Sequence, residues 1–160
     1  MGEFFQALQD TWLPTGIRDS TLLFPILYTF HIFGVVVLVG ATSALDLRML
    51  GVVMREEPVA DIAEMMLPWA KVGFIAQLIT GALLFVAQAA DLWHNGPFLL
   101  KMITVLLAGF NVLIFHQTAY RKVREWPKNW TPFAAKFFAI FSLICWAGIV
   151  TFSRLIAFYE

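Results

Sequence analysis

Cysteine and charge are both scarce in this 160-residue sequence. The single cysteine, Cys145, excludes an internal disulfide, a paired-cysteine redox motif and a metal site built from several thiolates. Charged residues make up only 14% of the chain, whereas a soluble domain carries about 25%. The 11 basic residues equal the 11 acidic ones, so the chain lacks the positive charge typical of nucleic-acid binding. We therefore expect neither a water-facing domain nor a nucleic-acid partner.

Hydrophobic residues, at 60% of the chain, are concentrated in four runs without Asp, Glu, Lys or Arg. These runs are Leu22–Leu45, Val72–Ala90, Met102–Tyr120 and Phe137–Ser153. A helix needs about 20 apolar residues to cross about 30 Å of hydrocarbon, and each run with its flanks supplies them. The pattern predicts an all-α integral membrane four-helix bundle in the lipid bilayer. It forms one transmembrane domain over residues 1–160, with spans at about 21–46, 69–90, 98–120 and 135–157.

A short amphipathic helix is predicted ahead of the first run. Its apolar residues recur at helical spacing: Phe4, Phe5, Leu8, Trp12 and Leu13. This pattern is typical of a helix that lies in the membrane interface, and Pro14-Thr15-Gly16 is expected to end it. Ser20 and Thr21 can cap the first span, where Pro25 is tolerated in the opening turn.

The connections between the runs predict little further structure. The longest polar interval, Asp46–Pro68, is expected to contain a separate short helix at Asp61–Leu67. The interval Asp91–Pro97 is expected to be a short loop. We see no linker long enough to divide the chain.

Basic residues predict the orientation of the spans. Most of them lie between runs one and two or between runs three and four: Arg48, Arg55, Lys71, Arg121, Lys122, Arg124, Lys128 and Lys136. The other side carries only Arg18, Lys101 and Arg154. Because loops rich in lysine and arginine stay in the cytoplasm, we expect both termini on the opposite side, which is the periplasmic side in a bacterium.

Polar side chains inside the predicted spans are the first candidates for function, because burying them in hydrocarbon is costly. His31 lies ten residues beyond Thr21, about 15 Å deep and near the midplane. Gly34, one turn later, leaves a groove that admits a flat ring or a close-packed helix. Lys101 and Arg154 lie about 10 to 15 Å above His31, near the outer surface.

These four residues predict a haem b site. The neutral imidazole of His31 supplies an axial iron ligand, Gly34 makes room for the macrocycle, and Lys101 and Arg154 pair with the propionates. The structural alternatives stay open: a membrane histidine also forms interhelical hydrogen bonds, and outer cations also extend to lipid headgroups.

Further candidates are His94, His116 and Asn111. Either histidine can serve as a second metal ligand or a proton site, while Asn111 is a cofactor contact or an interhelical hydrogen bonder. His31 and His116 differ by about 15 Å in depth, whereas two axial nitrogens on one iron lie about 4 Å apart. Two separate sites, or one five-coordinate haem, therefore fit better than one shared iron.

A wider pattern of residues resembles known membrane families. It comprises His31-Ile-Phe-Gly34, Gly40, Asp46-Leu-Arg-Met-Leu-Gly51, Trp69, Gly73-Phe74, Gly81, Phe98-Leu-Leu-Lys101, Asn111, His116, Trp146 and Arg154-Leu-Ile-Ala. From about residue 22 to 157 it resembles uncharacterised bacterial four-helix membrane proteins and, more distantly, CopD-type copper-resistance domains and HemJ-type protoporphyrinogen oxidases. The HemJ resemblance implies functional roles for His31 and Lys101 and bound haem b. We therefore expect a location in the bacterial inner (cytoplasmic) membrane.

The sequence leaves three functions open. The first is a haem b redox protein, an oxidoreductase or electron-transfer subunit that carries electrons between a quinone or small oxidant and an outer-side partner. The second is a non-catalytic accessory subunit of a larger respiratory or photosynthetic membrane complex, or a homo-oligomer. The third is CopD-like copper transport, for which thioether ligands are suited, although the six methionines do not line a span.

Overall fold

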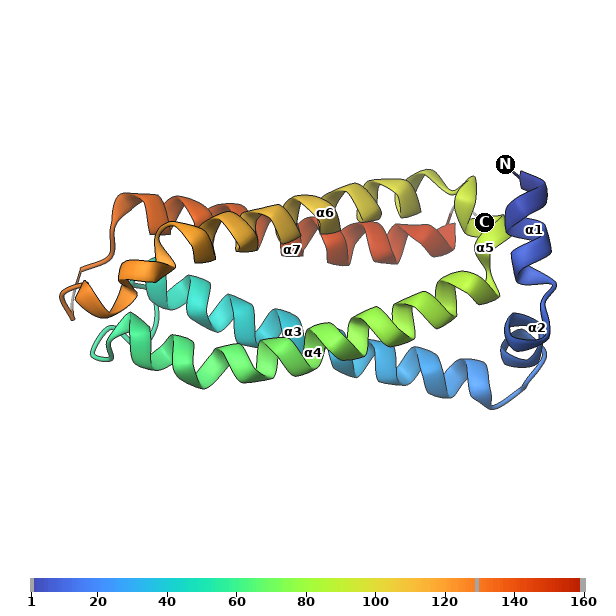
Figure 1. Cartoon of the computed structure of the whole chain (residues 1–160), viewed down its shortest axis with the longest axis horizontal. Coiled ribbons are helices and arrows are strands. Elements are labelled where there is room, and N and C mark those ends of the chain that lie inside the picture. Colours follow the sequence, from blue (N-terminus) through green and yellow to red (C-terminus); the bar gives the residue numbers. More distant parts are fainter. Residues whose placement is uncertain (1, 129, 159–160) are drawn as a thin grey trace.

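The computed structural model describes residues 2–128 and 130–158, which form helices joined by short turns (Figure 1). The long helices are α3 (Leu23–Met49), α4 (Val59–Ala87), α6 (Gly96–Gln117) and α7 (Phe133–Leu155). The short ones are α1 (Gly2–Gln9), α2 (Trp12–Arg18), α5 (Ala89–Trp93) and the 3-10 helices η1 (Tyr120–Glu125) and η2 (Ile156–Phe158). Each long helix is long and apolar enough to cross a membrane. The predicted all-α, multi-pass four-helix bundle is confirmed.

The long helices share one axis, and the short elements gather at its two ends (Figure 1). We call the end with α1, α2 and α5 the α1 end, and the end with η1 and the α3–α4 connection the η1 end. α3 packs against α4 and α6 against α7, and α3 with α7 is the main contact between the two pairs. α4 also contacts η1, which follows α6. The two pairs therefore meet toward the η1 end and separate toward the α1 end (Figure 1).

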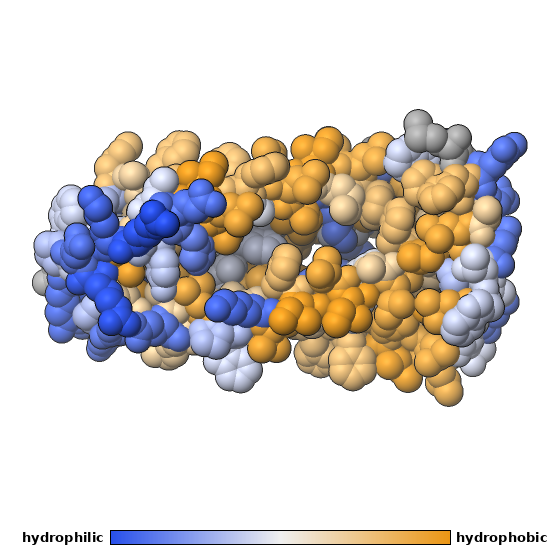
Figure 2. Space-filling model, in the orientation of Figure 1, coloured by the Kyte–Doolittle hydropathy of each residue, from blue (hydrophilic) through white to orange (hydrophobic). Residues whose placement is uncertain are grey.

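The larger hydrophobic core closes the η1 end of the bundle. Its buried residues are Leu45, Met49, Val59, Ile62, Ala63, Phe115, Val123, Ala135 and Ala139. A smaller cluster of Ala108, Cys145 and Ile149 joins α6 to α7. Most other large apolar side chains are exposed along the sides of the bundle, where a bilayer would cover them (Figure 2).

Glycines let α3 and α4 approach closely. A Cβ atom at Gly73 would lie 2.7 Å from the backbone nitrogen of Leu38, so a side chain there would displace the α3 backbone. A Cβ atom at Gly34 would lie 2.7 Å from Nε2 of Gln77, a flexible side chain. Helices in lipid associate through such close packing and through interhelical hydrogen bonds. Burial of apolar surface alone does not drive their association, because lipid tails are as apolar as the helix surface.

The N-terminal region differs from the prediction. Instead of one helix that ends at Pro14, the chain forms α1 and α2, with the break at residues 10 and 11. Pro14 lies in the first turn of α2, where amide groups have no intrahelical acceptor and proline is tolerated. Pro25 occupies the same kind of position in α3. The N-cap residue of α3 is Leu22, which has no side-chain cap, instead of the predicted Ser20 or Thr21, although the hydroxyl of Ser20 accepts a hydrogen bond from the amide of Leu23 at 3.1 Å.

Two connections are more helical than the sequence indicated. The short helix predicted at residues 61–67 is continuous with the second span, because α4 runs through Pro68. Residues 89–93 form the short helix α5, which includes the first three residues of the predicted loop at Asp91–Pro97. The hydrophobic pattern marks the lipid-crossing part of a helix, and it does not show where a helix continues beyond the hydrocarbon.

Candidate functional site

A polar cluster joins α3 to α4 in the half of the bundle toward the α1 end. Nδ1 of His31 lies 2.9 Å from Oγ1 of Thr80. The Thr80 hydroxyl donates its proton to the carbonyl of Ala76 at 2.6 Å. A hydroxyl has one proton, so Thr80 must accept the bond that His31 donates from Nδ1. The neutral imidazole of His31 therefore presents an unprotonated Nε2.

Small residues and one amide determine how His31 is seated. A Cβ atom at Gly81 would lie 3.3 Å from Cε1 of the imidazole, so α4 leaves just enough space for the ring. Gln77 donates from Nε2 to the backbone carbonyl of His31 and fills the space beside Gly34. Of the two occupants considered for the Gly34 groove, the structure has the close-packed helix.

Lys101 lies on α6, in the same half of the bundle as His31 on α3. His31 is eight residues into α3 and Lys101 is five residues into α6, or about 12 and 8 Å from the α1 end of each helix. The two side chains are both half-buried. Both residues therefore lie in the half of their helix toward the α1 end. Figure 2 shows an opening between the helix pairs in this half of the molecule, with hydrophilic side chains in it.

Arg154 and His94 lie closer to the α1 end and are exposed. Arg154 is in the last turn of α7, with its guanidinium carbon 5.5 Å from the ring centre of Phe158. His94 is the C-cap residue of α5. Both groups are therefore accessible at the surface, and neither forms a hydrogen bond to the His31 cluster among the described residues.

His116 and Asn111 lie toward the η1 end of α6. Nδ1 of His116 donates to the carbonyl of Val112, one turn earlier, at 2.9 Å. Asn111 is buried and donates from Nδ2 to the carbonyl of Phe138 on α7 at 3.1 Å, so it is an interhelical hydrogen bonder. The structure does not bring these two residues to His31. Among the described residues, no group of three or more His, Cys, Asp or Glu side chains is placed to hold a metal ion.

Sequence reasoning missed two buried ionisable residues in the last turn of α3. Asp46 and Arg48 are only 5% and 3% exposed. Oδ2 of Asp46 has no hydrogen-bond partner among the described residues, and Ser142 of α7 is the polar side chain beside this carboxyl group. Arg48 donates from Nε to the carbonyl of Glu57 at 2.7 Å and from Nη2 to the carbonyl of Lys128 at 2.8 Å.

A signal for these residues exists in the sequence. Asp46 directly follows the first uncharged run, at the end of the predicted span, and Arg48 comes two residues later, in what we assigned to the loop between spans one and two. The helix continues for one more turn, and that turn carries both side chains into the closed end of the bundle. Charged residues immediately after an apolar run are therefore candidates for burial when the helix is longer than the run.

The comparisons with known proteins give a family without an activity. A family model described as a family of unknown function (DUF6644) matches residues 22–159. The chain belongs to this family. The DUF6644 region includes the four long helices and contains His31, Lys101, Asp46 and Arg48, whereas α1 and α2 precede it. No curated protein and no solved structure matches the chain significantly.

Proposed function

We propose that this DUF6644 protein binds haem b and carries electrons across part of the membrane, between a quinone or another small oxidant and a partner at the α1 end. The observation that carries the proposal is the hydrogen bond from Nδ1 of His31 to Thr80. It keeps the proton on Nδ1 and leaves Nε2 available, which is the arrangement that an axial imidazole needs.

The residues around His31 fit such a group in part. Lys101 is half-buried in the same half of the bundle and can pair with a propionate, and the exposed Arg154 can do so at the surface. A haem b bound there would supply one-electron iron chemistry. His31 would be the imidazole that holds the iron, whereas His116, Asn111 and Gly34 are occupied by contacts within the bundle.

A spectrum of the purified full-length protein tests this proposal. We expect a Soret band and a pyridine haemochrome of the b type in protein produced with ample haem. His31→Ala should abolish both signals, because it removes the proposed iron ligand. Lys101→Gln should lower the haem content several-fold without abolishing it, since about 1 kcal/mol of charge pairing is lost.

His116→Ala is the matched control. It removes another histidine from a spanning helix, but one whose Nδ1 bonds within its own helix, and we expect the spectrum to stay unchanged. Elution of each variant in size-exclusion chromatography checks that it is folded. A colourless wild-type protein, or an unchanged spectrum in His31→Ala, overturns the proposal. A colourless protein that copurifies with a larger membrane complex would instead favour the accessory-subunit alternative.

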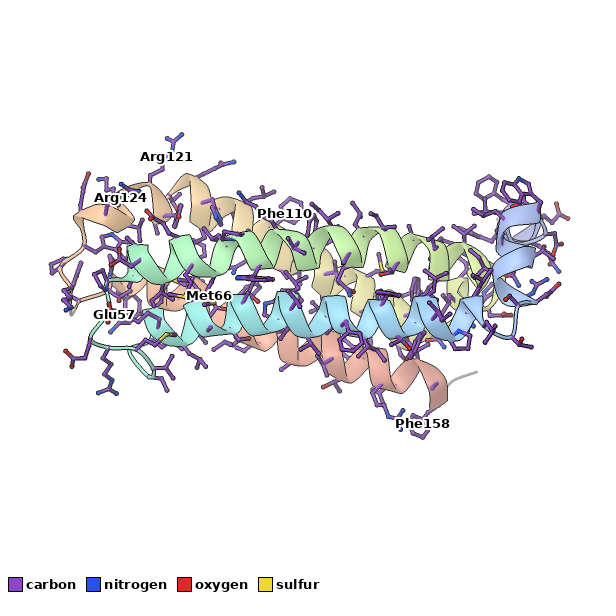
Figure 3. All side chains as sticks on the ribbon, turned by 90° about the horizontal axis from the view of Figure 1, so that it is seen from below. Glu57, Met66, Phe110, Arg121, Arg124 and Phe158 are labelled. Atoms are coloured by element: carbon purple, nitrogen blue, oxygen red, sulfur yellow. The ribbon has the colours of Figure 1, made fainter. Side chains whose placement is uncertain are left out.

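We also infer that the η1 end lies in the cytoplasm and that the membrane is a bacterial inner membrane. Figure 3 shows Glu57, Arg121 and Arg124 at the η1 end and Phe158 at the opposite end. The η1 end has the higher density of arginine and lysine, which supports a cytoplasmic position. In a Cys145→Ser background, His94→Cys should react with a membrane-impermeant maleimide from the periplasm, and Lys122→Cys only after the inner membrane is opened. The reverse pattern overturns this orientation.

A further inference from the structure

A basic pocket lies at the η1 end, away from the His31 cluster. It has a volume of about 380 Å³ and lies between the last turn of α3, the α3–α4 connection and the start of α7. Three cations line it, Arg48, Arg55 and Lys136, against one carboxylate, Glu56. The pocket therefore has an excess of positive charge that the described residues do not neutralise.

Arg48 is built into the wall of this pocket. Its bonds to the carbonyls of Glu57 and Lys128 use Nε and Nη2 and hold the guanidinium in place. Among the described residues Arg48 forms no ion pair, and Nη1 has no hydrogen-bond acceptor. Arg48 is thus a fixed, charged residue in the lining of the pocket.

The α3–α4 connection holds a second cation at the pocket. Arg55 donates from Nε to the carbonyl of Gly51. Gly51 and Met54 both have positive φ angles, of 72° and 48°. A non-glycine residue rarely adopts this backbone conformation, so the connection has a defined and unusual shape. That shape brings Arg55 back to Gly51, and both residues line the pocket with Arg48.

Two uncharged side chains complete the lining. Thr131 is 6% exposed, and its hydroxyl forms no hydrogen bond within the described residues. It also is not fully enclosed, so it is available to a molecule in the pocket. Trp130 is exposed beside it, at the end of the bundle where a tryptophan ring favours the membrane interface.

We propose that this pocket binds a phosphate group, carried either by an anionic phospholipid or by a small soluble phosphate ester. The arginine guanidinium, the lysine ammonium and a hydroxyl are the donors that phosphate oxygens accept best. The buried, pre-oriented Arg48 supplies the fixed contact, and Arg55 and Lys136 supply charge at the mouth. This proposal is independent of the haem proposal, because it involves the opposite end of the bundle.

The test measures binding to the full-length protein in a neutral detergent. The probes are dioleoylphosphatidylglycerol, dioleoylphosphatidylcholine and glycerol 3-phosphate, each titrated while intrinsic tryptophan fluorescence and thermal unfolding are followed. We expect the anionic lipid, the soluble ester or both to bind the wild type at least about tenfold more tightly than phosphatidylcholine. Binding of the anionic lipid alone identifies a lipid headgroup, and equal binding of glycerol 3-phosphate identifies a soluble ester.

Two pairs of variants make the test specific. The double variant Arg55→Gln and Lys136→Gln should weaken binding about thirtyfold, because each cation near an anionic headgroup increases the affinity about fivefold. Arg121→Gln with Lys122→Gln removes two exposed cations at the same end that do not line the pocket, and should change binding less than about threefold. Glu56→Gln should tighten binding about threefold or more, whereas Glu57→Gln, whose side chain lies outside the pocket, should not.

Glu56→Gln is expected to tighten binding, whereas the Arg55 and Lys136 substitutions weaken it. A loss of folding can only weaken binding, so tighter binding in Glu56→Gln cannot result from misfolding. The proposal is overturned if neither phosphate probe binds more tightly than phosphatidylcholine. It is also overturned if the Arg121 and Lys122 pair loses as much affinity as the Arg55 and Lys136 pair, because the attraction would then come from the general charge of this end.

Discussion

The two halves of the bundle treat their polar groups in opposite ways. Toward the η1 end, Asp46 and Arg48 are almost completely buried in the larger core, and Arg48 ties two chain connections together. Toward the α1 end, the helix pairs separate (Figure 1), and His31 and Lys101 are only half-buried. The contrast indicates that the η1 half holds the fold together, whereas the α1 half is packed more loosely around its polar groups.

The largest effect that we predict is on Arg48. Arg48→Ala leaves the carbonyls of Glu57 and Lys128 without their donor and separates the α3–α4 connection from the η1–α7 connection. With about 1.5 to 3 kcal/mol for each hydrogen bond to a charged group, we expect the free energy of unfolding in mixed detergent micelles to fall by about 3 kcal/mol or more. Arg121→Ala, an exposed arginine at the same end, is the control and should change it by less than about 0.5 kcal/mol.

Arg48→Lys refines this prediction. A lysine keeps the charge but has one small donor group, so it cannot reach two carbonyls as the planar guanidinium does. We expect a loss between those of the alanine variant and the wild type. Equal stability of Arg48→Lys and the wild type would show that charge alone matters, and the closed end would then not depend on the bridge between the two connections.

An intermediate effect is expected at the α3–α4 contact that both halves share. Gly73→Ala places a methyl group 2.7 Å from the backbone nitrogen of Leu38, which forces the helices apart at a cost of about 1 to 3 kcal/mol. Gly34→Ala meets the movable amide of Gln77 and should cost less. Gly40→Ala meets nothing within 4 Å and should stabilise the helix by up to about 1 kcal/mol. Thermal unfolding of the three variants checks this order, and a neutral Gly73→Ala would contradict the close contact.

The sequence predicted the fold well, because an uncharged run of helical length has few alternatives in a bilayer. It also singled out His31 and Lys101 as candidates, and the structure places both half-buried in the half of the bundle toward the α1 end. It could not identify Thr80 as the partner of His31, since the pairing depends on the register between α3 and α4. Nor did it identify the burial of Asp46 and Arg48, because their position depends on how far α3 continues past its apolar run.

The smallest change in stability is expected at Thr80, and it separates structure from function most sharply. Thr80→Val keeps the shape of the side chain but removes the acceptor for Nδ1 of His31. Interhelical hydrogen bonds in membrane proteins contribute about 0.6 kcal/mol on average, so unfolding should shift only slightly.

The control for Thr80→Val is Thr29→Val on α3. Both variants lose a hydroxyl bond to a carbonyl of their own helix, that of Ala76 for Thr80 and that of Pro25 for Thr29. Only Thr80→Val also loses a bond between helices. If His31 is an iron ligand, Thr80→Val should shift the Soret band or reduce the haem content, because Nδ1 no longer has a fixed partner, and Thr29→Val should leave the spectrum unchanged. A Thr80→Val loss as large as that of Arg48→Ala would show that both halves of the bundle are equally structural, and the contrast between them would fail.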